Sequence, residues 1–135
     1  MLKYVTLGPV KPGTSVIPVN IRLGQSFIKS VKWLGDSLFV LNSSNQICAF
    51  KNKNFDLAVE ISFSDNSDTI CDFLAVENKD GETEILTIAT NGFLSVDKDI
   101  LTNVEIQGDL KMSRVGKDCV VVANNQVCRF KCKYK

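Results

Sequence analysis

The residues that could do chemistry are few, and the most regular group lies at the C-terminal end. The last eight residues alternate between apolar and basic side chains and read Cys128-Arg129-Phe130-Lys131-Cys132-Lys133-Tyr134-Lys135. Successive side chains of a strand point to opposite faces, so this pattern places all the cations on one face. Such a basic stripe could bind phosphate or an acidic partner. Lysines also guard sheet edges against mispairing, and we favour that interpretation.

A second group is acidic. Asp65, Asp68 and Asp72 lie close together in the sequence, with Asn66 and Ser67 between the first two. The composition is typical of a calcium loop, but the regular Asp-x-Asp-x-Asp-Gly spacing and the closing Glu of an EF-hand are missing. We therefore predict a solvated turn here and no metal site.

The cysteines and the histidine count restrict the chemistry further. The chain has five cysteines, an odd number without a Cys-x-x-Cys pair, and they are Cys48, Cys71, Cys119, Cys128 and Cys132. Each falls in an expected strand, so we predict reduced, buried core residues. Histidine is absent, which removes Ser-His-Asp and Cys-His nucleophile systems and most catalytic zinc sites. Carboxylates remain, at Asp36, Asp68, Asp72 and Asp118, but no spacing pairs them. We expect no catalytic residue and no cofactor.

Composition is that of an ordinary globular domain. The chain has 135 residues, of which 44% are hydrophobic and 23% charged, with a net charge of +1. This near-neutral balance gives no overall field that would favour nucleic acid or an anionic membrane. No apolar run is long enough to cross a membrane, and the N-terminus lacks the apolar core of a signal peptide. We expect an intracellular protein, cytoplasmic or nuclear, that does not insert into membranes.

One short segment is repeated. Asn45-Gln46-Ile47-Cys48-Ala49-Phe50-Lys51 returns as Asn125-Gln126-Val127-Cys128-Arg129-Phe130-Lys131, with a weaker copy over 91–98. Each copy follows an apolar run and a turn, and a recurrence every few tens of residues is typical of repeat folds. Asn91-Gly92 carries the strongest hairpin signal, and we predict a type I′ turn with positive φ at both residues.

The repeats divide the chain into groups of short strands. We predict an all-β domain over 16–135, with a strand at 16–23 and groups at 27–63, 70–106 and 110–134, after an irregular arm at 1–15. The second strand of the first group, Leu38–Leu41, is apolar throughout, as in strands buried on both faces, and Ile85–Ala89 matches it in the second group. No segment keeps the apolar spacing of a helix over three turns.

Four-stranded groups of this kind resemble the blades of divergent WD40-like β-propellers, found in intracellular scaffold subunits such as those of vesicle-tethering and coat complexes. The resemblance covers Phe27 to Lys135. It implies about three antiparallel blades, but no functional residue, because the Trp-Asp and Gly-His dipeptides of the family are missing. A β-sandwich or barrel is the alternative fold.

Three blades are fewer than the four to eight that close a ring. The strand at 16–23 could complete the last blade, and a longer chain, a second copy or another protein subunit would have to complete the ring. Phe27, Val31 and Trp33 are candidates for one open face, although their shared face also makes Trp33 a core candidate. At the other end, the candidate contacts are Cys128, Phe130 and Tyr134 together with Arg129, Lys131 and Lys133.

The function expected from these observations is a non-catalytic interaction or scaffold module of an intracellular multi-subunit assembly, for example in protein transport. Its partners would be other protein subunits or a second copy. The alternative is a small sandwich or barrel that binds a ligand or nucleic acid, which would require a basic groove with exposed aromatic residues. We do not expect nucleic-acid binding, because the eight phenylalanines lie mostly in apolar patterns.

Overall fold

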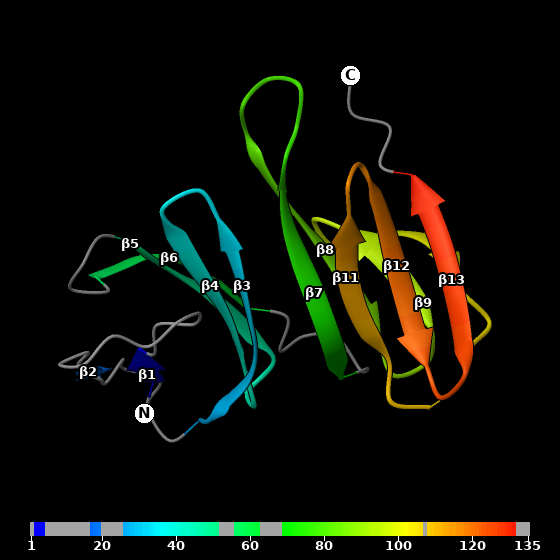
Figure 1. The fold of residues 1–135 in the computed structure, drawn as a ribbon, viewed down its shortest axis with the longest axis horizontal. Coiled ribbons are helices and arrows are strands. Elements are labelled where there is room, and N and C mark those ends of the chain that lie inside the picture. Colours follow the sequence, from blue (N-terminus) through cyan, green and yellow to red (C-terminus); the bar gives the residue numbers. More distant parts are fainter. Residues whose placement is uncertain are drawn as a thin grey trace, which may run out of the picture.

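The protein is all-β and consists of small antiparallel sheets (Figure 1). The structure is a computed structural model and describes residues 2–4, 17–19, 26–51, 56–62, 69–106 and 108–131. Within these ranges there is no helix, and three sheets of four, four and three strands follow one another along the chain, none of them closed into a barrel. The predicted all-β class and the division of the strands among three sheets are confirmed.

In each sheet, consecutive strands are neighbours. The first sheet contains β3 (Ile28–Leu34), β4 (Ser37–Asn42), β5 (Gln46–Lys51) and β6 (Asp56–Ser62). The second contains β7 (Ile70–Glu77), β8 (Thr83–Ala89), β9 (Phe93–Val96) and β10 (Asp99–Asn103). The third contains β11 (Lys111–Val115), β12 (Asp118–Ala123) and β13 (Gln126–Lys131).

The structure describes Ile17–Val19 of the strand expected at 16–23, and this part has a different partner from the one expected. β2 (Ile17–Val19) pairs with β1 (Leu2–Tyr4), with Pro18 opposite Lys3. Among the described residues it does not pair with the third sheet. Residues 5–16 and 20–25, which hold most of the predicted arm and the rest of this strand, lie outside the described ranges.

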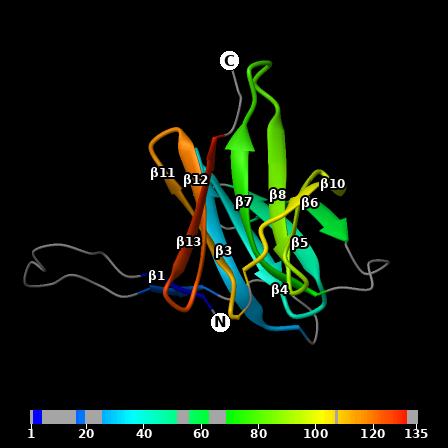
Figure 2. The ribbon, with the colours of Figure 1, turned by 90° about the vertical axis from the view of Figure 1, so that its right-hand side faces the viewer.

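The three sheets lie side by side in chain order, with their first strands gathered together. β7 packs between β3 and β11, each of which is the first strand and one edge of its own sheet. Figure 1 shows the first sheet on the left, the second in the centre and the third on the right. Turning the molecule by 90° brings the third sheet toward the viewer (Figure 2).

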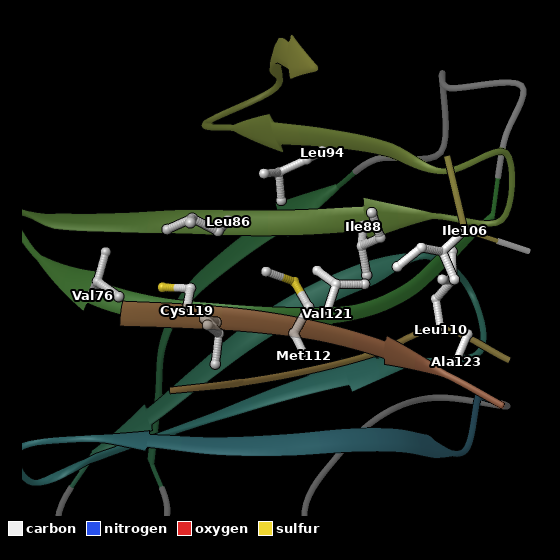
Figure 3. Packing of buried hydrophobic residues seen from close by; sticks show 11 residues of the cluster. Val76, Leu86, Ile88, Leu94, Ile106, Leu110, Met112, Cys119, Val121 and Ala123 are labelled. Atoms are coloured by element: carbon white, nitrogen blue, oxygen red, sulfur yellow. The ribbon is translucent and has the colours of Figure 1, made fainter. Parts of the chain in front are cut away.

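Two apolar layers hold the sheets together. Between the first and second sheets the buried residues are Phe39, Leu41, Ile47, Ala49, Ile70, Phe73, Ala75, Ile85 and Ala89. Between the second and third they are Leu74, Val76, Leu86, Ile88, Leu94, Ile106, Leu110, Met112, Cys119, Val121 and Ala123 (Figure 3). Fully burying one such aliphatic side chain contributes about 1.5–3 kcal/mol, so these layers are the main source of stability.

The apolar runs in β4 and β8 are buried on both faces, as predicted. In β4, Phe39 and Leu41 face the second sheet, whereas Leu38 and Val40 belong to a separate buried cluster with Cys48 and Phe50. Alternate side chains of a strand point to opposite faces, so the Leu38–Leu41 run of β4 can be apolar throughout only because both of its faces are covered.

The turn at Asn91-Gly92 differs from the prediction. Gly92 has a φ of +88°, but Asn91 is not among the described residues with positive φ. The N–H of Gly92 donates to the carbonyl of Ala89 at 2.9 Å, so Thr90 and Asn91 form the centre of the turn and Gly92 follows it. The type I′ prediction is therefore wrong at this place, because the loop between β8 and β9 is longer than two residues.

A two-residue turn with positive φ at both positions occurs instead between β9 and β10. Asp97 and Lys98 have φ values of 49° and 75°, and Val96 lies opposite Asp99 on either side of them. A left-handed conformation costs a residue with a Cβ atom roughly 1–2 kcal/mol, and glycine avoids most of this cost.

Replacing Lys98 with glycine should therefore stabilise the protein, by about 0.5–1 kcal/mol. The matched control is Lys117→Gly, because Lys117 also lies in a hairpin turn but is not among the residues with positive φ. The control should lower the melting temperature while Lys98→Gly raises it. Equal shifts for the two variants in thermal unfolding would contradict this assignment of the turn.

Candidate interaction surface

One buried carboxylate links the first strands of all three sheets. Asp72 lies on β7 and is only 2% exposed. Its Oδ1 accepts hydrogen bonds from the Ser30 hydroxyl on β3 at 2.6 Å and from the Phe73 N–H at 2.9 Å. Its Oδ2 accepts from the Met112 N–H on β11 at 2.8 Å and lies 3.4 Å from the Lys32 ammonium on β3. We call this group of contacts the Asp72 junction.

Two lysines of β3 extend the junction across its neighbours. Besides meeting Asp72, the Lys32 ammonium donates to the Met112 carbonyl at 2.8 Å, and the Lys29 ammonium donates to the Ile70 carbonyl at 2.7 Å. Pairing shifts register between Ile28 and Ser30 on β3 and between Ile70 and Asp72 on β7. A bulge re-aims the side chains near it, so the two matching bulges bring Ser30 and Asp72 together.

Asp72 is therefore not part of a solvated turn, and that prediction is wrong for this residue. It is buried because its carboxylate is satisfied by protein donors, as buried charges require. Asp65 and Asp68 lie outside the described residues. Within the described ranges, no group of three or more potential metal ligands comes together.

The junction fixes how the sheets stack, and the stacking defines a front face for each of them. We define the front face of a sheet as the side that points toward the next sheet along the chain. The front face of the first sheet includes Phe39 and Leu41 and is covered by the second sheet. That of the second sheet includes Leu86 and Ile88 and is covered by the third. Among the described residues, no further sheet covers the front face of the third.

Strand register gives the residues of this uncovered face in three rows. Residues directly opposite one another on paired strands share a face. The rows, from β11 through β12 to β13, are Lys111-Val122-Val127, Ser113-Val120-Arg129 and Val115-Asp118-Lys131. The face is thus a patch of four valines bordered by three cations and one carboxylate.

The exposure of the valines distinguishes this face from its counterparts. Val115 is 56% exposed and Val127 is 67% exposed, whereas Leu86 and Ile88 of the second sheet are 1% and 0% exposed. The Arg129 guanidinium forms an ion pair with the buried Asp118 carboxylate, so this arginine is held over the patch. Lys111 and Lys131 are exposed.

The outer edge of β13 is the second unusual feature of the third sheet. In the first two sheets the third strand pairs with a fourth, β6 or β10. No described strand pairs with β13 on the side away from β12. Alternate residues of β13 therefore present backbone N–H and C=O groups to this edge, and such an edge is a template for a further strand.

The predicted contact residues at this end divide between the two faces of β13. Arg129 and Lys131 lie on the front face, as a basic stripe should. Cys128 and Phe130 lie opposite Val121 and Cys119, and pack half-buried against the core between the second and third sheets. The expectation that these two line the open face is wrong, because strand alternation directs them inward. Lys133 and Tyr134 lie outside the described residues.

At the other end of the stack the predicted residues are exposed. Phe27 is 68% exposed, Val31 40% and Trp33 58%, so the core alternative for Trp33 is wrong. Val31 and Trp33 lie opposite Val40 and Leu38, on the face of the first sheet that points away from the second. They border the buried cluster that Leu38, Val40, Cys48 and Phe50 form there.

The sequence pattern did not show that the valines of the front face lie on an uncovered surface. Val120 and Val122 alternate with Cys119 and Val121, all of them apolar, so the pattern predicts burial on both faces of β12 without showing which face is covered. The available signal was the repeat: Val127 matches Ile47, which is buried by the neighbouring sheet in the first copy.

The four described cysteines are not disulfide-bonded: Cys48 and Cys119 are buried, and Cys71 and Cys128 are half-buried. Burial raises the pKa of the Cys48 thiol above its usual value, and the nearby Glu60 carboxylate raises it further. Burial likewise raises the pKa of Cys71. A raised pKa keeps the thiol protonated, and the protonated form is neither a nucleophile nor a metal ligand.

Thiol titration should therefore label the native protein slowly at neutral pH, at no more than two of its five cysteines, and all five after denaturation. Labelling should accelerate as the pH rises toward the raised pKa values, because the thiolate is the reactive form. Rapid reaction of four or five thiols in the folded protein at pH 7 would contradict a structural role.

The part of the chain that the structure describes contains no helix long and apolar enough to cross a membrane. No protein-family model matches the chain, and a search of curated proteins finds no significant match.

Proposed function

We propose that this chain is a non-catalytic protein-interaction module of an intracellular multi-subunit assembly, and that its three sheets are blades of a partial WD40-like β-propeller. The observation that carries the proposal is the uncovered front face of the third sheet. The equivalent faces of the first two sheets are buried by a neighbouring sheet. The third presents Val115 and Val127 to solvent instead.

The propeller assignment is supported by three features taken together. Each sheet is an antiparallel meander in chain order, the sheets pack face to face, and their first strands gather on one side of the stack. Propeller blades are arranged in this way around their axis, and typical rings need about four to eight blades. Three blades leave room for a partner that supplies the missing sheets.

The chemistry of the uncovered face supports a protein partner. Monomeric proteins rarely expose large contiguous apolar patches, and such patches with a polar rim mark interaction sites. Here the four valines are bordered by Lys111, Arg129 and Lys131. The pattern of an apolar centre with a charged rim is that of protein–protein interfaces.

The direct test is photo-crosslinking in an extract of the source cells. A benzophenone amino acid at position 127 should form a crosslink to a partner subunit, and the matched control is the same group at position 100. Ile100 is a suitable control because it is 65% exposed, close to the 67% of Val127, but lies on β10 of the second sheet.

A charge substitution tests the same face without a crosslinker. Val127→Lys should reduce the recovered partner at least tenfold, and Ile100→Lys should leave it unchanged. Both side chains are exposed, so neither variant should lower the melting temperature appreciably. Crosslinks that are absent at position 127, or equal at the two positions, would overturn the proposed function.

A further inference from the structure

The third strands of the first and third sheets have nearly the same sequence but different surroundings. β5 reads Gln-Ile-Cys-Ala-Phe-Lys over 46–51, and β13 reads Gln-Val-Cys-Arg-Phe-Lys over 126–131. The outer edge of β5 is paired with β6. No described strand pairs with the outer edge of β13. The first sheet is therefore an internal template for what the edge of β13 would accept.

The pairing of β5 with β6 shows which chemistry this motif accepts. Lys51 lies opposite Asp56, and Phe50 lies opposite Leu57. Further along, Ile47 lies opposite Ile61. The occupant of the β5 edge thus places an acidic residue against the lysine and aliphatic residues against Phe50 and Ile47. Cross-strand pairs of this kind are the units that stabilise a sheet.

The second acidic residue of β6 is also used in pairing. Glu60 lies opposite Cys48 and accepts a hydrogen bond from the Gln46 side chain at 3.0 Å. The glutamine of the motif is present in β13 as Gln126. β13 differs from β5 chiefly at Arg129, which takes the place of Ala49 and adds a cation. Arg129 forms an ion pair with Asp118 on the neighbouring strand, so Lys131 is the cation that an acidic strand would meet.

We propose that the outer edge of β13 binds an extended antiparallel strand of a partner protein, which combines acidic with aliphatic residues as Asp56–Ser62 does. The inference rests on the proposed function and specifies its partner. By the register of β5 with β6, an acidic residue of the strand would lie opposite Lys131, and aliphatic residues opposite Phe130 and Val127. Backbone bonds to the edge would supply affinity, and the alternating side chains specificity.

Charge disfavours the simplest alternative occupant, a second copy of the same edge. A two-fold pairing of β13 with β13 centred on Arg129 would bring the two arginines opposite each other. Like charges opposite one another destabilise strand pairing. The one carboxylate on this part of the face, Asp118, forms an ion pair with Arg129. Lys131 has no ion pair within the described ranges and therefore favours a partner with an acidic residue.

The experiment titrates the full chain with two capped peptides. One has the β6 sequence Asp-Leu-Ala-Val-Glu-Ile-Ser, and the other replaces both of its acidic residues with lysine. Amide exchange, followed by NMR, is read residue by residue over β13. We expect the acidic peptide to bind saturably, at least tenfold more tightly than the reversed peptide, and to slow exchange of alternate β13 amides at least tenfold.

Charge reversal on the protein supplies the matched control. Lys131→Glu should invert the preference between the two peptides, because Lys131 lies at the occupied edge. Lys117→Glu should leave the preference unchanged, because Lys117 is an exposed residue of the turn between β11 and β12. The two variants make the same change of net charge, so a general electrostatic effect would move both equally and would overturn the proposal.

Three further outcomes would overturn strand addition. One is the absence of binding by either peptide. Another is a β13 edge that is already protected in the free monomer, which would mean that the chain fills it itself. The third is protection that grows with protein concentration together with dimer formation in sedimentation, which would assign the edge to a second copy. If the crosslink at position 127 still forms in any of these cases, the proposed function as an interaction module is retained. If that crosslink is also absent, both the interaction function and the strand addition are overturned.

Discussion

Replacing Asp72 with alanine is expected to lower the free energy of unfolding by about 3–5 kcal/mol, the cost typical of breaking a buried charge pair. The substitution leaves the Ser30 hydroxyl, the Lys32 ammonium and the Met112 N–H without their acceptor. Each of these donors is at least partly buried, so water replaces the lost bond incompletely. Urea unfolding of the variant and the wild type measures the difference.

Two milder variants keep this prediction testable if Asp72→Ala does not fold. Asp72→Asn retains the shape and accepting oxygen but removes the charge, and should cost roughly half as much. Ser30→Ala removes one neutral partner and should cost about 1–2 kcal/mol. A loss below 1 kcal/mol for Asp72→Ala would mean that the three strands are held together without the junction.

Replacing Gly92 with alanine is the second large effect, expected at about 2–3 kcal/mol. Its φ of +88° disfavours any Cβ atom, and a left-handed residue costs roughly 1–2 kcal/mol. A Cβ atom here would also meet the Asn103 Oδ1 at 2.7 Å. Asn103 would have to move, although its side chain accepts from the Glu105 N–H at 2.8 Å and donates to the Asn91 carbonyl at 3.0 Å.

Gly35→Ala is the control that separates the two causes. Gly35 has a φ of +58°, but a Cβ atom there would meet nothing within 4 Å. This variant should therefore show the conformational cost alone, about 1 kcal/mol. Denaturant unfolding of both variants gives the cost of the clash by difference. Equal losses would show that Asn103 adapts freely.

The sequence was most informative where a pattern depends only on neighbouring residues. The apolar runs of β4 and β8 predicted strands buried on both faces, and the repeat predicted the matching positions of β5 and β13. Strand alternation and hydrophobicity act locally, so they can be recognised without knowledge of the tertiary structure.

Features that depend on distant pairing were not predictable. Asp72 resembled a member of a local acidic turn, but its partners Ser30 and Met112 lie 42 and 40 residues away. Trp33 shares an alternating pattern with a core strand, yet alternation does not reveal which face a neighbouring sheet covers. The type I′ turn falls at Asp97-Lys98 rather than Asn91-Gly92 because strand register, and not the dipeptide, sets loop length.

The separation of the Asp72 contacts along the chain also has a kinetic consequence. Each sheet is a meander of consecutive strands, and such local pairing closes short loops and forms early. The Asp72 bonds span 40 and 42 residues, so we expect them to form late, when the three sheets dock. Interactions that are absent from the transition state slow unfolding without accelerating folding. We therefore expect the junction to slow the unfolding of the stacked sheets. It should contribute little to the rate at which they fold.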